Sequence, residues 1–288
     1  MSQREAMHVS RRRFGETIVG ALASFALGGA CRRASGAREA DDGRLAARPR
    51  AHVETSAKGE RPLGLDRARD AILHLPPKAT ADPLPLIVLL HGAGGSAEGV
   101  LRRLGSAPDE AGVAVLAPHS RDSSWDAVRD SFGPDVAFLD RALERVFETV
   151  AVDPERLAVG GFSDGATYAL SLGLINGDLF RRVVAFSPGF VVEGTPHGKP
   201  RFFISHGTAD PILPIDRCSR RIVAGLQKRG YDVTFREFHG GHEIPPDIAR
   251  DGMRTVQSSV ASRQSSVRSR QSSVSVVSRL SRQSPVGG

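Results

Sequence analysis

Residues 157–174 read LAVGGFSDGATYALSLGL, and this stretch decides the fold. Its start, up to Gly160, is a short apolar run of the kind found in strands buried on both faces. From Ser163 onward the composition becomes that of a helix. Residues 161–165, where the strand passes into the helix, read Gly-Phe-Ser-Asp-Gly. The two glycines permit a turn too tight for larger side chains. The stretch predicts a serine hydroxyl raised above a sheet edge, at a helix N-terminus.

Apolar strands and helices alternate on both sides of this turn. Strands are expected at 71–75, 86–90, 113–117, 157–160, 183–186, 202–204 and 233–238, and helices at 136–150, 163–174 and 217–228. Such alternation with short connections predicts an α/β fold, a mostly parallel sheet covered by helices on both faces. Functional sites in such sheets form just beyond the carboxyl ends of the strands.

The ends of these elements carry their own signals. The strand at 71–75 is followed by two prolines and is expected at an edge of the sheet. Asp135 is expected to cap the N-terminus of the helix at 136–150. Gly230 is a suitable stop for the helix at 217–228.

Composition divides the chain into four segments. Residues 67–256 hold the strand and helix pattern and form the predicted domain. Residues 1–31 are an expected export signal, and residues 32–66, which lack periodicity, an expected flexible linker. Residues 257–288 repeat Ser-Arg-Gln-Ser and are expected to form a disordered tail, with a functional basic arm as the alternative.

The net charge of +7 belongs to the two ends of the chain. Residues 1–62 and 263–288 each carry an excess of five positive charges, whereas residues 63–262 are mildly acidic. Nucleic-acid binding requires a basic patch on the folded body, so it is not expected. The two cysteines, Cys31 and Cys218, show no metal-ligand spacing. The sequence therefore implies no metal.

The N-terminal segment resembles an export signal. Arg11-Arg12 precedes an apolar stretch at 18–30 that is too short to cross a bilayer comfortably. Twin arginines in this position are typical of Tat-type signals. Such a signal implies either cleavage after Ala30 or attachment of a lipid to Cys31. A lipid on Cys31 would be the expected contact of the protein with a membrane. The alternative is a disordered basic N-terminus on a cytoplasmic protein.

Three residues have the order needed for nucleophilic catalysis. A serine hydroxyl is a poor nucleophile at neutral pH, so it needs a base and a group that orients the base. Asp210 follows the strand at 202–204, and His242 lies in a glycine-rich loop after the strand at 233–238. The sequence therefore predicts a triad of Ser163, Asp210 and His242.

Neighbouring residues offer alternatives. Asp216 is a second candidate acid, but its place before a helix favours an N-cap. His239 is a second candidate base, but it ends a strand and is expected to pack against its neighbours. His206 is expected to bond within the loop of the catalytic acid. The side chain of Asp164 is expected to serve as a helix N-terminal carboxylate.

A tetrahedral oxyanion needs backbone N–H donors. One is expected from Asp164, which follows the serine, and the second from the loop 91–95, His-Gly-Ala-Gly-Gly. Ala93 is the favoured donor and Gly94 the alternative. A phosphate-binding loop would need a following Gly-Lys-Ser/Thr, which this sequence lacks.

Two inter-strand segments bear on substrate size. Residues 187–201 are rich in Pro and Gly and too short for a helical lid domain. The segment 119–134 holds the only tryptophan, Trp125, which either packs internally or stacks on a substrate.

Four motifs together resemble a known family. They are Leu89-Leu90-His91-Gly92, residues 161–165, His206-Gly207-Thr208-Ala209-Asp210-Pro211 and Gly240-Gly241-His242-Glu243. They are similar to motifs of the phospholipase/carboxylesterase branch of α/β-hydrolases, and more loosely of polyhydroxybutyrate depolymerase-like and feruloyl esterases. The resemblance covers about residues 70–255. It implies an α/β-hydrolase fold and cofactor-free serine ester hydrolysis, and it carries over the triad with the donors Ala93 and Asp164. Ala166, where many relatives have a second glycine, departs from the pattern.

The expected function is a serine carboxylesterase that hydrolyses small soluble esters through an acyl-enzyme. Aryl esters are included if Trp125 faces the pocket. The alternatives are a non-catalytic binding protein on the same fold, or another reaction such as peptide or lactone hydrolysis or acyl transfer.

Overall fold

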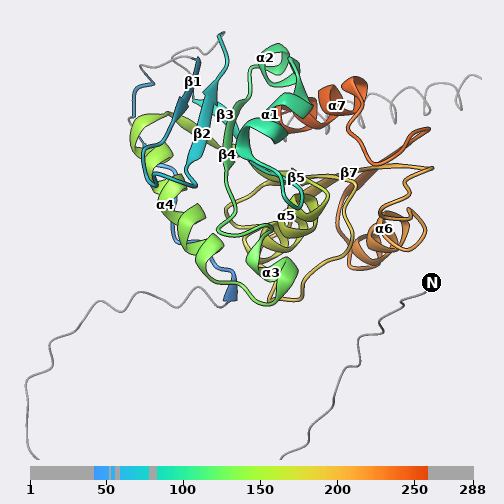
Figure 1. Cartoon of the computed structure of the whole chain (residues 1–288). Helices are drawn as coiled ribbons and strands as arrows, with labels where there is room; N and C mark the ends of the chain where they lie inside the picture. Colours follow the sequence, from blue (N-terminus) through green and yellow to red (C-terminus); the bar gives the residue numbers. More distant parts are fainter. Residues whose placement is uncertain (1–41, 52, 56–58, 78–82, 259–288) are drawn as a thin grey trace, which may run out of the picture. The chain divides into compact units, whose positions relative to one another are not determined.

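The structure, a computed structural model, describes residues 42–51, 53–55, 59–77 and 83–258 (Figure 1). The expected export signal with Arg11-Arg12 and Cys31 lies outside the described residues, and so does the repeat tail from residue 259. Within the described part of the chain, no helix is both long and apolar enough to cross a membrane.

In the part of the chain that the structure describes, eight strands form one sheet in the order β1-β2-β4-β3-β5-β6-β7-β8. They are β1 Gly59–Pro62, β2 Ala71–Leu75, β3 Leu84–Leu90, β4 Ala114–Pro118, β5 Val152–Phe162, β6 Arg182–Phe186, β7 Arg201–Gly207 and β8 Val233–Phe238. The six strands from β4 to β8 are parallel, which confirms the predicted fold class. The prediction that β2 lies at the edge is wrong, because β1 pairs with it antiparallel from the segment assigned to a linker.

The described residues also form seven helices. They are α1 Ala97–Leu104, α2 Ala107–Ala111, α3 Asp126–Arg129, α4 Pro134–Thr149, α5 Asp164–Ile175, α6 Ser219–Lys228 and α7 Pro246–Gln257. The three predicted helices correspond to α4, α5 and α6. Two predicted caps are wrong. Asp135 lies inside the first turn of α4 and is buried, and Asp216 lies two residues before Cys218, the N-cap of α6.

The sheet separates two apolar cores. Leu86, Val88 and Leu90 of β3 pack into the core shared with α4, α5 and α6, whereas Ile87 and Leu89 pack into the core shared with α1, α2 and α7. The two groups of helices cover opposite faces of the sheet (Figure 1). Because both faces are covered, every residue of β3 is buried, which explains its unbroken apolar sequence.

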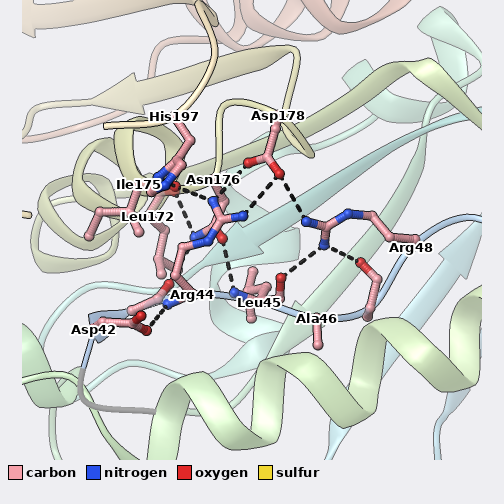
Figure 2. Close-up of polar contacts among 12 residues, drawn as sticks. Asp42, Arg44, Leu45, Ala46, Arg48, Leu172, Ile175, Asn176, Asp178 and His197 are labelled. Atoms are coloured by element: carbon pink, nitrogen blue, oxygen red, sulfur yellow. Dashed lines mark hydrogen bonds and ion pairs between the residues drawn. The ribbon is translucent and has the colours of Figure 1, made fainter. Parts of the chain in front are cut away.

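Residues 42–51, which we call the docked segment, correct the predicted boundary of the domain at residue 67. The Arg44 guanidinium donates to both carboxylate oxygens of Asp178, at 2.8 and 3.0 Å, and to the Ile175 carbonyl at the end of α5 (Figure 2). Arg48 donates to the same carboxylate at 2.9 Å. The hydrogen bond from Arg44 holds the pKa of Asp178 well below its usual range. Side-chain bonds of this kind leave no periodicity in the sequence.

Asn176 fixes the docked segment from inside the molecule. Its side-chain oxygen accepts from the Leu45 N–H at 2.9 Å, and its amide nitrogen donates to the Gly43 carbonyl at 2.8 Å (Figure 2). Asn176 is fully buried and Leu45 is 2% exposed. Buried backbone groups of the segment therefore depend on one amide side chain.

Asn176→Ala is expected to lower the free energy of unfolding by about 1–3 kcal/mol, because it leaves buried backbone groups without partners. Asp178→Asn, which weakens a half-exposed ion pair, is the control, with a loss below about 1 kcal/mol. Urea unfolding measures both, and hydrogen exchange at the Leu45 amide should accelerate in the first variant. Equal losses in the two variants would contradict the assigned role of Asn176.

Candidate active site

Ser163 stands at the tight turn that its sequence context predicts. It follows β5 and precedes α5, with φ 58° and ψ −120°, a backbone conformation that non-glycine residues rarely adopt. Its N–H donates to the Phe186 carbonyl at 3.0 Å, which ties the turn to the end of β6. Residues in such strained conformations persist only where the surrounding structure imposes them.

The glycines of the turn are required by backbone contact. A Cβ at Gly165 would overlap the carbonyl oxygens of Leu90 and His91, and a Cβ at Gly161 would overlap the backbone of Gly165. The first turn of α5 is thus pressed directly against the carboxyl end of β3. This contact leaves Ser163 as the residue that projects beyond the sheet edge.

His242 is held by Asp210. Its Nδ1 lies 2.6 Å from Asp210 Oδ2, while the N–H groups of Ile212 and Leu213 donate to Oδ1 at 2.9 Å each. Burial by itself would raise the pKa of Asp210. The bonds from Leu213, His242 and Ile212 outweigh burial, so the pKa lies below its usual value. The carboxylate is therefore ionised at neutral pH and can orient the imidazole with Nδ1 protonated.

Ser163 and His242 line one cavity of about 610 Å³. Its wall includes Ala93 of the glycine-rich loop, Phe162 and Ile212. In the described part of the chain, the side chains of Ser163 and His242 form no hydrogen bond with each other. Such bonds are commonly long before a substrate is bound and shorten in the complex.

The loop after β3 distinguishes between Ala93 and Gly94, the two candidates for the second oxyanion donor. The Gly94 N–H donates to the Ser123 carbonyl at 2.7 Å and is therefore engaged. Ala93 is exposed and lines the cavity beside Ser163. The backbone of Asp164 lies in the first turn of α5, where N–H groups have no partner within the helix. The geometry favours Ala93 over Gly94.

His91 and Trp125 hold this loop in place. The His91 ring bonds the Gly92 carbonyl through Nδ1 at 2.7 Å and accepts from the Ser120 N–H at Nε2, so it is neutral, and burial lowers its pKa. Trp125 is fully buried and donates from Nε1 to the His91 carbonyl at 2.8 Å. The suggested contact of Trp125 with a substrate is therefore wrong, and the packing alternative is correct.

A polar network behind the site was not predicted. Asp135 accepts from the N–H groups of Arg121 and Asp126, at 2.6 and 2.7 Å, and the Tyr168 hydroxyl donates to Asp126. Burial raises the pKa of Asp135 to about 6. In the sequence, an acid after Pro134 has the signature of a helix cap, so nothing local indicated that it fixes the loop containing Trp125.

The alternative residues lie apart from the cavity. His239 is exposed, which corrects the expectation that it packs, and Asp216 is exposed and pairs with Arg220. His206 is structural as expected, with its ring between the Ser219 hydroxyl at 2.6 Å and a backbone carbonyl. The carboxylate of Asp164 accepts from Ser124 at 2.6 Å.

Gly165→Ala is expected to destabilise the protein by several kcal/mol or to prevent folding, because the added methyl group meets rigid backbone. Gly225→Ala in α6 is the matched control. Its Cβ would meet nothing within 4 Å, so stability should rise by about 0.5–1 kcal/mol. Thermal unfolding of both variants measures the contrast. A Gly165→Ala protein as stable as the wild type would refute the close contact at the turn.

Comparison with known proteins identifies the family of the chain. Residues 113–262, about half of the chain, match the sequence model of the Phospholipase/Carboxylesterase family. NocK of Nocardia uniformis subsp. tsuyamanensis, a protein assigned as an esterase, is 34% identical over 185 residues, covering 60% of this chain and 53% of the relative. A protein assigned as feruloyl esterase C in Aspergillus flavus is 29% identical over 158 residues, 51% of this chain and 57% of the relative. The chain thus spans about half the length of these curated relatives.

The fold is also shared with solved structures. The crystal structure of esterase PE8 superposes with a TM-score of 0.52 at 24% identity, covering 64% of this chain and 98% of that one. At this identity the likeness concerns the fold alone. Together with the family match and the parallel sheet, it shows that the chain belongs to the phospholipase/carboxylesterase family and has the α/β-hydrolase fold.

Proposed function

We propose that the protein is a serine esterase that hydrolyses small soluble carboxylic esters through an acyl-enzyme. The observation that carries this proposal is the cavity in which Ser163, at a strained turn, lies with His242, whose Nδ1 is 2.6 Å from the buried carboxylate of Asp210. Membership of the phospholipase/carboxylesterase family supports ester hydrolysis as the reaction.

In the proposed mechanism, the Ser163 hydroxyl attacks the ester carbonyl while His242 Nε2 takes its proton. Asp210 holds the imidazole and stabilises the imidazolium that forms. The N–H groups of Ala93 and Asp164 stabilise the oxyanion, assisted by the dipole of α5. The tetrahedral intermediate then collapses, and His242 returns the proton to the leaving alcohol. Water repeats the sequence on the acyl-enzyme and releases the acid, without a cofactor.

An open cavity supports small soluble substrates. The segment 187–201 between β6 and β7 contains no helix, so nothing in it resembles the helical lid that lipases open at an interface. Trp125 is buried, so the aromatic ring in the cavity wall belongs to Phe162 instead. A preformed cavity of this kind needs no lipid surface to expose it.

Nitrophenyl esters of increasing acyl length test the reaction and the substrate size together. We expect the highest kcat/KM for acetate or butyrate and no jump in rate when longer esters begin to aggregate. Ser163→Ala should lower kcat by about 10⁴–10⁶-fold and abolish labelling by a fluorophosphonate probe, with unchanged circular dichroism. Turnover at the wild-type rate in the folded variant would refute the serine mechanism. A long-chain optimum would refute only the substrate size.

The two histidines beyond β8 form a matched pair of variants. His242→Ala should lose most activity, because it removes the proposed base, whereas His239→Ala should retain activity within a few-fold. Steady-state kinetics on a nitrophenyl ester measures both. The opposite ranking would move the base to His239 and contradict the role given to the bond with Asp210.

A further inference from the structure

Two arginines share the cavity with Ser163 and His242. Arg102 and Arg103 lie in the last turn of α1, and both line the cavity wall. No aspartate or glutamate of the described chain belongs to that wall. The proposed catalytic serine therefore faces a space whose fixed side-chain charges are positive.

Arg103 is held in position by stacking. Its guanidinium carbon lies 4.5 Å from the centroid of the Phe162 ring, and that ring lies 4.7 Å from the ring of His242. Cation–π contact of this kind restrains an otherwise mobile side chain. Because Phe162 precedes Ser163 directly, the stack keeps a cation close to the reacting group.

The acidic side chains nearby are engaged with other partners. Glu98, which shares a second hollow with Arg102, pairs with His119 at 3.5 Å, and Glu60 of the same hollow lies 3.8 Å from His74. Among the described residues, no ion pair neutralises Arg102 or Arg103. Basic side chains at the C-terminus of α1 also interact favourably with the helix dipole. That interaction does not depend on whether the guanidinium groups lie on the cavity wall.

We propose that Arg102 and Arg103 bind a carboxylate of the substrate, so that the preferred substrates are esters that carry a free carboxylate a few atoms from the scissile bond. The planar guanidinium matches the geometry of a carboxylate. The apolar wall formed by Val100, Phe162 and Ile212 suits the short carbon chain between the two groups. This inference rests on the proposed function and specifies its substrate class.

The free carboxylate of the ester can belong to its acyl part or to its alcohol part. Two pairs of substrates distinguish these two positions. Monomethyl glutarate is compared with dimethyl glutarate, and 4-acetoxybutanoate with butyl acetate. Each kcat/KM is measured by pH-stat titration and divided by the rate of alkaline hydrolysis of the same ester. We expect the anionic ester to be favoured roughly tenfold in at least one pair, the gain expected of one charge-assisted hydrogen bond.

Arg102→Gln and Arg103→Gln should each lower this anionic-to-neutral ratio several-fold, and Arg103→Lys, which keeps the charge but not the planar guanidinium, should restore part of it. Arg254→Gln removes a basic residue from the last turn of α7, away from the cavity wall, and should leave the ratio unchanged. The preference should also shrink between about 0.01 M and about 1 M salt, where the Debye length falls from about 30 Å to about 3 Å.

Ratios near one in both pairs, or ratios that Arg102→Gln and Arg103→Gln leave unchanged, would overturn this inference. Hydrolysis of the neutral esters, abolished by Ser163→Ala, would in that case still support the proposed function. No hydrolysis of any ester by the folded wild-type protein would overturn both.

Discussion

The close approach between the first turn of α5 and the carboxyl end of β3 constrains the whole site. At Gly165 the two backbones meet without room for a methyl group. This contact fixes the strained conformation of Ser163 and brings the loop after β3 beside it. The strain is supported by the sheet, because the Ser163 N–H is bonded to Phe186 in β6. The hydroxyl is thus positioned by backbone contacts between a helix and the strands of the sheet.

Two buried titratable residues of the site, His91 and Asp210, differ in what sets their protonation state. Burial lowers the pKa of His91 although its bond to the Gly92 carbonyl acts in the opposite direction, and the neutral ring holds the glycine-rich loop through its bonds to Gly92 and Ser120. Asp210 is buried as well, but the N–H donors and His242 stabilise its charged form. Burial thus decides the protonation state of His91, whereas the hydrogen bonds together outweigh burial at Asp210.

Much of this architecture follows from local sequence, and the remainder depends on contacts between distant segments. The turn at Ser163, the strands β2 to β8 and the helix α4 are predictable because their signals lie within a few neighbouring residues. Asp135 has the sequence signature of a helix cap, because sequence cannot show that its carboxylate accepts from the start of α3, nine residues earlier in the chain. The docked segment, residues 42–51, has the sequence of a linker, since its attachment relies on Asn176, more than a hundred residues away.

The same distinction explains why the specificity of the site was harder to predict than its chemistry. The residues proposed to act on the ester follow strand ends in a fixed order, which the sequence displays directly. The arginines of α1 reach the cavity only because α1 packs on the face of the sheet above β3. Because the segment 187–201 contains no helix, we expect discrimination between substrates to come from such fixed wall residues. Arg103, already held against Phe162, loses less conformational freedom on binding an anion than an unrestrained side chain would.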